Sequence, residues 1–221
     1  QIFGDNGTQH GLAIRLILHG TLGIAGFCLQ RQQLHGGSHL GQDGLELGIG
    51  QEDLVHFTAE IYLAQELGKE LVIMDMDFDS VVNSVAGIGD VAKCDIAMAG
   101  LTVRADREEY VTFSDSYYKA SQRIIVKGDD AEFDECKTAA DVEAILNEKG
   151  DTIKIGVQNG TTGQFYVEGD EEWGFDGFKA TPVGYKNGSL AIQDMLNGNI
   201  DYVIIDAAPA QCITESINEM A

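Results

Sequence analysis

No stretch of the sequence contains the roughly 20 consecutive apolar residues that a membrane-spanning helix requires. Basic residues are also scarce: 14 Lys and Arg stand against 36 Asp and Glu, which gives a net charge of -22 at pH 7. This charge would repel a polyanion, so we expect no nucleic-acid partner. The acidity favours solubility and suits a secreted or cell-surface protein. At 221 residues the chain can bury a core as one large domain or as two small lobes.

The sequence also lacks the residue spacings of metal and catalytic sites. Its four cysteines form no CxxC pair, which argues against zinc and leaves any disulfide pairing open: Cys28, Cys94, Cys136 and Cys212. All five histidines precede residue 57, and the glycines between His35 and His39 disfavour a shared helix face for a metal. No Ser/His/Asp or Cys/His set is visible in the remainder. We therefore expect no enzymatic activity, no metal site and no cofactor.

A short buried strand is predicted by the apolar run Ile96–Ala99, which is bounded by a charge and a glycine. Gly100 and Thr102 follow its carboxyl end, and Arg107 provides the only guanidinium expected there. Ligands of open α/β sheets bind at strand ends. A glycine permits close backbone approach, and a guanidinium can hold a carboxylate through two parallel hydrogen bonds. The segment therefore predicts a site for a small carboxylate.

A second polar segment, Gly160–Gly163, follows a strand expected at 154–158 and leads into a helix. Backbone N–H groups at a helix amino end, together with the hydroxyls of Thr161 and Thr162, favour an anion. A phosphate loop is disfavoured because the lysine of GxxxxGK[ST] is missing. Two threonines that merely cap the helix are the simpler alternative, but the presence of Arg107 elsewhere favours an anion site.

A third polar group, Asp206, follows a strand expected at 201–205. A carboxylate at this strand end can accept hydrogen bonds from an ammonium group. Considered alone, such a residue more often caps the helix that follows it. The residues by themselves leave both interpretations open.

Helical and strand patterns alternate in the rest of the chain. The expected helices and strands in the first half are a helix at 59–67, a strand at 70–74, a helix at 77–86 and a strand at 95–99. This alternation predicts an α/β fold with a parallel sheet. The alternating aspartates before Ser80 lack the glycine and closing glutamate of a calcium loop, so we expect a helix cap at Asp79 or Ser80 instead. Further helices are expected at 136–149 and 189–196.

The order Gly-x-Thr-x-x-x-x-Arg, then Phe-Ser-Asp-x-Tyr-Tyr, then the two later motifs resembles the polar amino-acid binding proteins of ABC importers. These are the type II periplasmic or extracellular solute-binding proteins, and the resemblance runs from about Phe57 to about Cys212. It implies a two-lobed α/β fold with lobe one at 57–124 and lobe two at 125–221, and no return of the chain to lobe one. Lobe one would then be incomplete.

The same resemblance implies a role for each polar residue of the three motifs. Arg107 would hold the ligand's α-carboxylate, helped by Thr102 and by the Thr161 and Thr162 loop. Asp206 would accept from the α-ammonium, and the Gly100 carbonyl would be a second acceptor. The expected ligand is a polar α-amino acid, with glutamine, glutamate, histidine and basic amino acids all open.

Residues 1–56 do not match this family and differ in composition, since they hold every histidine and no lysine or tyrosine. We predict that this segment is foreign to lobe one, which would leave the ligand cleft without its aromatic loop. An alternative is a lipoprotein signal with Cys28 as the acylated residue. Phe27 is too large for that processing site and no basic region precedes the apolar stretch, so no clear signal peptide is visible.

The expected function is extracytoplasmic binding of the amino acid by closure of the two lobes, followed by delivery to an ABC permease in the membrane. We expect a monomer in the periplasm or outside the cell. Two alternatives have the same fold: a dehydratase-type enzyme, which needs an acid or base in the cleft, and a ligand-sensing domain of a receptor.

Overall fold

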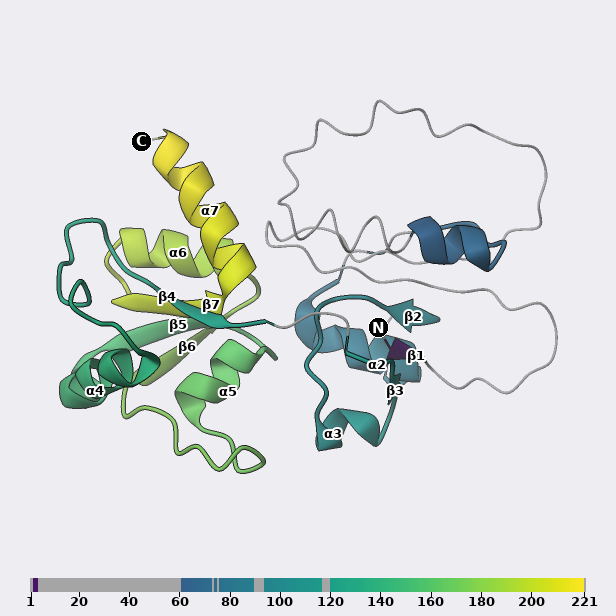
Figure 1. The fold of residues 1–221 in the computed structure, drawn as a ribbon, viewed down its shortest axis with the longest axis horizontal. Helices are drawn as coiled ribbons and strands as arrows, with labels where there is room; N and C mark the ends of the chain where they lie inside the picture. Colours follow the sequence, from purple (N-terminus) through teal and green to yellow (C-terminus); the bar gives the residue numbers. More distant parts are fainter. Residues whose placement is uncertain are drawn as a thin grey trace. The chain divides into compact units, whose positions relative to one another are not determined.

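The computed structural model describes residues 2–3, 61–72, 74, 76–89, 94–116 and 120–220. They form two compact units, which we call unit 1 and unit 2 (Figure 1). Described residues up to 116 belong to unit 1, except 77–79, which group with the later residues in unit 2. The predictions about Cys28 and the histidines lie outside the described residues, and the lobe boundary at 124 stays a prediction.

Unit 2 is built on a four-stranded sheet in the order β4-β7-β5-β6. The strands are β4 (Gln122–Ile125), β5 (Lys154–Gln158), β6 (Thr181–Tyr185) and β7 (Tyr202–Asp206). Strand β5 pairs in parallel with both β6 and β7, whereas β4 pairs with β7 in antiparallel register. Because β5 and β7 are parallel neighbours, their carboxyl ends share one edge of the sheet.

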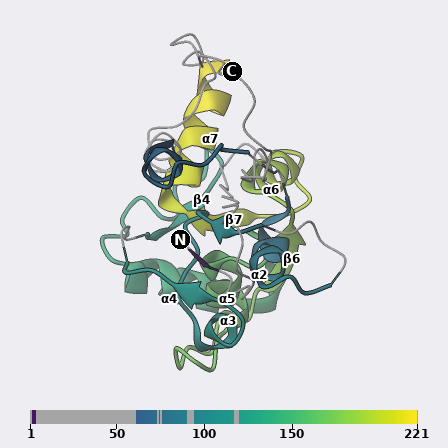
Figure 2. The same ribbon diagram turned by 90° about the vertical axis from the view of Figure 1, so that its right-hand side faces the viewer.

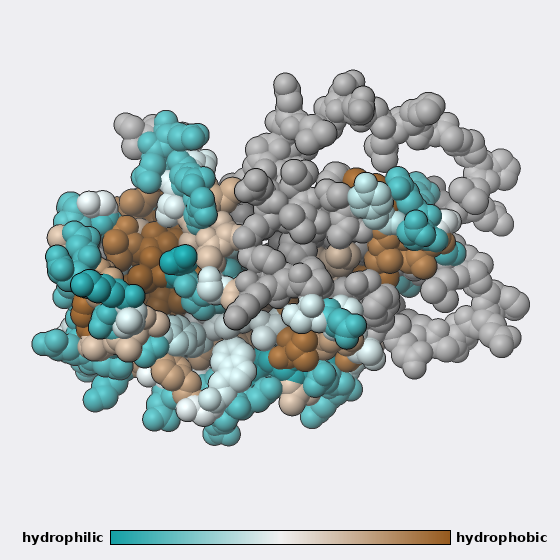
Figure 3. Space-filling view, in the orientation of Figure 1, coloured by the Kyte–Doolittle hydropathy of each residue, from teal (hydrophilic) through white to brown (hydrophobic). Residues whose placement is uncertain are grey.

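Helices cover both faces of this sheet (Figures 1 and 2). They are α4 (Ala139–Lys149), α5 (Thr162–Glu168), α6 (Gly188–Leu196) and α7 (Ala207–Met220). Strand β7 is apolar on both sides because Val203 and Ile205 pack with α6 and α7, while Ile204 packs with α4 and α5. Such continuous apolar runs are typical of parallel strands buried on two faces. In Figure 3 apolar side chains gather on unit 2 beside α7.

Local capping explains where two of these helices begin. Thr138 and Asp141 form a reciprocal capping box at α4, with the Asp141 carboxylate accepting from the Thr138 backbone N–H at 2.8 Å. Hydrogen bonds from the Lys137 backbone N–H and from Thr138 hold the pKa of the Asp141 carboxyl below its ordinary value. The side chain of Asn187 accepts from the Leu190 N–H at 3.0 Å and caps α6. These bonds satisfy N–H groups that a helix start leaves without a partner.

Unit 1 has a smaller sheet in the order β2-β1-β3. Its strands β1 (Ile2–Phe3), β2 (Ile96–Ala97) and β3 (Thr112–Phe113) each contain two residues, and β1 is antiparallel to both neighbours. Residues 61–66 are helical. A 3-10 turn, η2 (Phe78–Ser80), whose first two residues group with unit 2, precedes α2 (Val81–Ala86). Helix α3 (Ala105–Glu108) lies between β2 and β3. The buried side chains include Val81, Val85 and Ile96.

Two expectations for unit 1 are wrong. Residues 70–72 and 74, expected in a strand, have no strand structure, and the strand pairs described in unit 1 are antiparallel rather than parallel. A short apolar run shows that a segment is buried, but it becomes a strand only where a neighbouring strand offers hydrogen bonds. Ser80 does stand at the start of α2 as expected, although its side chain makes no capping bond. Among the described helices, none is both long and apolar enough to cross a bilayer.

Candidate functional site

The chain leaves β2 through Gly100, whose φ of 57° lies in the left-handed region. A Cβ built on this residue meets nothing within 4 Å, so the glycine is required by the backbone conformation and not by space. Thr102 follows it and is half-buried. The predicted glycine and threonine therefore lie together on the loop at the carboxyl end of β2.

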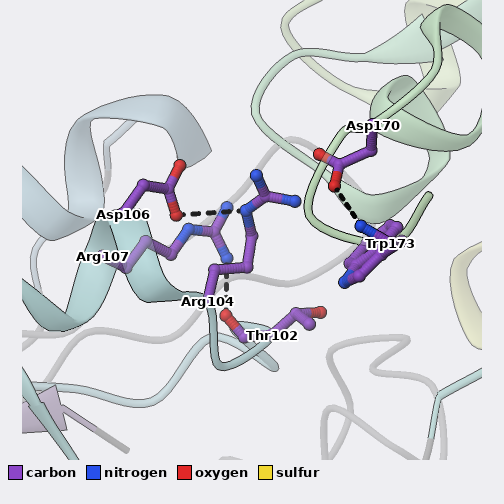
Figure 4. Close-up of polar contacts among 6 residues, drawn as sticks. All are labelled: Thr102, Arg104, Asp106, Arg107, Asp170 and Trp173. Carbon is purple, nitrogen blue, oxygen red and sulfur yellow. Dashed lines mark hydrogen bonds and ion pairs between the residues drawn. The ribbon is translucent and has the colours of Figure 1, made fainter. Parts of the chain in front are cut away.

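Arg107 lies on α3 and its guanidinium reaches back to this loop (Figure 4). Its Nη1 donates to the carbonyl oxygen of Thr102 at 2.9 Å. A guanidinium carries five N–H donors in a fixed fork, and this bond uses one of them. The bond sets the position of a half-buried cation beside the backbone of the loop. Two residues predicted to bind the same carboxylate are thus in direct contact.

A second guanidinium in the same segment corrects the expectation that Arg107 is the only one. Arg104 is 7% exposed, and its Nε lies 3.1 Å from Asp106 Oδ1 (Figure 4). Its backbone carbonyl also accepts from the N–H groups of Arg107 and Glu108 at the start of α3. The sequence signal was present as the run Arg-x-x-Arg, but only the second arginine stood at the motif position. Arg104 therefore supports the turn that carries Arg107.

In unit 2 the loop after β5 contains the two predicted threonines. Gly160 has a φ of 74°, and its N–H donates to Gln164 Oε1 at 2.7 Å. Thr161 occupies the N-cap position of α5, but its hydroxyl donates to the Gln158 carbonyl at 2.8 Å and makes no capping bond. The simpler interpretation, in which both threonines cap the helix, is thus wrong for Thr161. Thr162 is the first residue of α5.

The start of α5 packs directly on β7 at Gly163. A Cβ at this glycine would lie 2.8 Å from the Ile204 carbonyl oxygen and 2.9 Å from Gln122 Oε1. No real Cβ tolerates such distances to backbone, so only glycine allows this approach. The close packing brings the Thr161 and Thr162 loop to the edge of the sheet where β7 ends.

Asp206 is the last residue of β7 and is half-buried. Its carboxylate Oδ1 accepts a hydrogen bond from Gln122 Nε2, and the two residues are paired across β4 and β7. The N–H of Ala207, the first residue of α7, donates to the Ser121 carbonyl at 2.7 Å. Sequence reasoning missed Gln122, since nothing in the spacing of β4 marked it as a partner of a residue so far along the chain.

Other charged and phenolic groups of unit 2 pair with one another. Tyr185 donates to Asp194 at 2.5 Å, and burial followed by this bond raises the pKa of the Tyr185 hydroxyl to about 12. Lys149 lies 2.6 Å from Glu132, and this partner raises the pKa of the lysine. Burial and a hydrogen bond to Glu143 raise the pKa of the Tyr166 hydroxyl. Within the described part of the chain, no cluster of three or more potential ligands could hold a metal ion.

Comparison with known proteins matches most of this chain to one family. The sequence model of the bacterial extracellular solute-binding proteins, family 3, matches residues 57–207. ABC transporter arginine-binding protein 1 of Escherichia coli (strain K12) is 30% identical over 146 residues, covering 66% of this chain and 51% of that protein. The histidine-binding periplasmic protein of Salmonella typhimurium (strain LT2) is 26% identical over 203 residues, covering 90% of this chain and 70% of that protein.

A solved structure agrees with these sequence matches. An ancestral amino acid-binding protein, described as a precursor of cyclohexadienyl dehydratase, superposes with a TM-score of 0.59 at 28% identity, covering 73% of this chain and 63% of that chain. The two-lobed α/β fold predicted from the sequence is confirmed by these matches.

The matches cover only part of the relatives, and they differ in how far they extend towards the start of this chain. The chain spans 38%, 51% and 54% of three curated relatives, which is about half of their length. The match to the histidine-binding protein covers 90% of the chain, more than residues 57–221 provide, so it extends into the segment before residue 57. The family model does not match that segment. That residues 1–56 are foreign to the family stays a prediction.

Proposed function

The chain belongs to the bacterial extracellular solute-binding proteins, family 3, and we propose that it binds a polar α-amino acid outside the cytoplasm for delivery to an ABC importer. The observation that carries this proposal is that a member of this family has a guanidinium, Arg107, at the loop after one strand and a carboxylate, Asp206, at the end of another. Arginine and histidine are the first ligands to test, because the relatives carry those amino acids in their names.

The carboxylate of the amino acid is assigned to Arg107. Its contact with Thr102 supports this role, because the bond restrains a long side chain before any ligand arrives. A restrained guanidinium loses less conformational entropy on binding. Thr102 and Thr162 are proposed to donate to the same carboxylate. Thr161 would join them by turning its hydroxyl away from the Gln158 carbonyl, to which it donates in the structure.

The ammonium of the amino acid is assigned to Asp206, with the Gly100 carbonyl as a second acceptor. Support comes from the place of Asp206 at the end of a strand that is buried on both faces, where a carboxylate is held by the sheet. We propose that the two units close around the ligand. Closure would exclude water and strengthen these charge-assisted hydrogen bonds.

The proposed partner is a membrane permease of an ABC importer, and the proposed state is a monomer in the periplasm or outside the cell. Family membership supports both the amino-acid ligand and the location. Anchoring through an acylated Cys28 is a further alternative. It predicts labelling of the full-length protein by a radioactive fatty acid, which a Cys28→Ser variant would lose.

A second candidate function is a dehydratase on the same fold. One superposed structure is described as a precursor of cyclohexadienyl dehydratase, although that ancestor itself is described as an amino acid-binding protein. Incubation with an arogenate- or prephenate-like acid tests this candidate through the appearance of product. The alternative of a sensor domain is tested by the neighbouring genes. Permease and ATPase genes beside this one would favour transport over sensing.

The decisive experiment measures thermal stability of the protein with each of the twenty amino acids. A ligand present at a hundred times its dissociation constant adds about 2.7 kcal/mol to the free energy of unfolding. Arg107→Ala is expected to weaken the binding by about 2–5 kcal/mol, because truncation leaves the ligand carboxylate without its partner. Arg123→Ala, an exposed arginine on β4, is the matched control and should bind normally.

Asp206 is tested with pairs of ligands that differ only in the amino group. Asp206→Asn should weaken an α-amino acid far more than the corresponding acid without the amino group, because its proposed partner is the ammonium alone. Equal losses for both ligands would assign Asp206 to the structure of unit 2. No stabilisation of the wild-type protein by any amino acid would reject the proposed function itself.

A further inference from the structure

Gln122 lies opposite Asp206 across the antiparallel pair of β4 and β7, and its amide Nε2 donates to the Asp206 carboxylate. We propose that Gln122 is a positioning residue that holds this carboxylate in the orientation that accepts the ammonium of the ligand. This inference rests on the proposed function, since it gives Asp206 a ligand to face. It extends that function to a residue that no motif contains.

The chemistry of the amide fixes how Gln122 is oriented. A carboxylate accepts hydrogen bonds and does not donate them, so the group of Gln122 that meets it must be the NH₂ and not the carbonyl. The carbonyl Oε1 therefore points the other way, towards Gly163 at the start of α5, where a Cβ would lie 2.9 Å from it. The side chain thus fills the space between the end of β7 and the first turn of α5.

Burial restricts this side chain further. Oε1 of Gln122 is buried and has no hydrogen-bond partner among the described residues. An acceptor without a donor is unfavourable, so a different residue would be expected here if the position served packing alone. The hydrogen bond to Asp206 explains why a glutamine occupies this position. The requirement for glycine at position 163 has the same origin, because any side chain there would collide with this amide.

The neutrality of Gln122 also matters for the proposed ligand. A lysine or arginine at this place would cancel the charge of Asp206, whereas a neutral amide orients the carboxylate without cancelling its charge. The first turns of α5 and α7 carry no acidic residue, so Asp206 is the anionic group that this amide meets. The neighbouring Arg123 is exposed and points to the opposite face of the strand, as successive strand residues do.

The first test replaces Gln122 by methionine, which keeps the length of the side chain and removes the donor. Gln122→Met is expected to weaken binding of the α-amino acid about tenfold, the size of one hydrogen bond to a charged group. Binding of the matching acid without the amino group should change by less than about twofold, since that ligand makes no use of Asp206. Gln211→Met is the control, because exposed Gln211 also donates to a carboxylate, Glu215 Oε1, at 2.8 Å.

The second test uses Gln122→Glu, which places a carboxyl group against Asp206. Two carboxylates in contact share one proton, since both cannot ionise at neutral pH. An arriving ammonium should expel that proton, so calorimetry in buffers of different ionisation enthalpy is expected to show proton release with the amino acid. The acid without the amino group should release none. This signature would not arise from a change in folding stability alone.

The outcomes separate the inference from the function on which it rests. Equal weakening of both ligands by Gln122→Met, or no weakening of either, overturns the positioning role while the proposed function stands. If Gln122→Met does not fold, binding by Gln122→Glu without proton release overturns the role in the same way. If wild-type protein binds no amino acid, the proposed function and this inference both fail.

Discussion

The two units hold their proposed ligand-binding groups by different means. In unit 1, Arg107 lies on the four-residue helix α3 and bonds to Thr102, five positions earlier in the chain. In unit 2, Asp206 ends a strand at the centre of a buried sheet and bonds to Gln122, 84 positions away. The cationic group therefore depends on local chain geometry, while the anionic group depends on the completed fold. Substitution of Arg107 in unit 1 should therefore reduce ligand binding with little loss of stability, whereas substitutions in the unit 2 sheet should reduce stability.

The largest expected effect comes from removing core volume beneath the unit 2 sheet. Ile155 on β5 is fully buried, so Ile155→Ala should lower the free energy of unfolding by about 2–5 kcal/mol. Urea denaturation followed by circular dichroism measures this loss. Leu196→Ala removes a side chain that is 52% exposed and should stay within about 0.5 kcal/mol of wild type. Similar losses for the two variants would show that the Ile155 side chain contributes no more to stability than an exposed leucine.

A smaller effect is expected at the contact between α5 and β7. Gly163→Ala places a Cβ against the Ile204 carbonyl, which cannot move easily, and should destabilise by about 1–3 kcal/mol. Gly188→Ala is the matched control at the start of α6, because its Cβ would meet the flexible end of Ile205 instead. The same denaturation experiment compares the two variants. A larger loss of unfolding free energy for Gly188→Ala than for Gly163→Ala would show that the contact between α5 and β7 accommodates a methyl group more easily than the start of α6 does.

The two arginines of unit 1 should separate stability from binding. Arg104→Ala should reduce stability by up to about 1 kcal/mol, since its partner Asp106 is largely exposed, and should bind amino acid nearly as well as wild type. Arg107→Ala should show the reverse pattern. Thermal unfolding gives the stability and calorimetry the affinity of each variant. If Arg104→Ala instead abolishes binding, the carboxylate has been assigned to the wrong guanidinium.

The smallest effect concerns acid stability in unit 2. Hydrogen bonds from Tyr185 and Asn199 hold the pKa of the Asp194 carboxyl below its ordinary value. A lowered pKa in the folded state stabilises the protein above the unfolded pKa of about 3.9, and the benefit is lost as pH falls. Asp194→Asn should therefore differ most from wild type near neutral pH and converge with it towards pH 3. Glu171→Gln, an exposed change, should show no such convergence in thermal melts.

Local signals in the sequence predicted most of unit 2. The strand expected at 154–158 coincides with β5, and the helix expected at 189–196 begins one residue earlier as α6. The expected 201–205 strand is β7, shifted by one residue. Apolar runs and helix caps are local properties, so a single sequence records them. The placement of β7 between β4 and β5 depends on contacts between residues far apart in the chain, so local patterns in the sequence did not predict it.

The same distinction explains what was found of the candidate site. Thr102 and Arg107 were predicted to bind the same carboxylate because both follow one strand end in a short segment. The structure shows in addition that the two residues are in contact. Gln122 and Arg104 were missed for different reasons. Gln122 acquires a partner only through the pairing of β4 with β7. Arg104 lies outside the motif, and only its burial and its contact with Asp106 indicate a structural role.

The order β4-β7-β5-β6 has a consequence for how unit 2 forms as the chain is synthesised. β5 and β6 can pair as soon as Tyr185 has been made, whereas β4 has no neighbour in the sheet until β7 follows it. The last strand joins the two earlier parts, so the four strands cannot form one sheet before β7 is available. Because β7 also brings Asp206 opposite Gln122, the proposed ammonium acceptor is positioned only when the unit 2 sheet is complete.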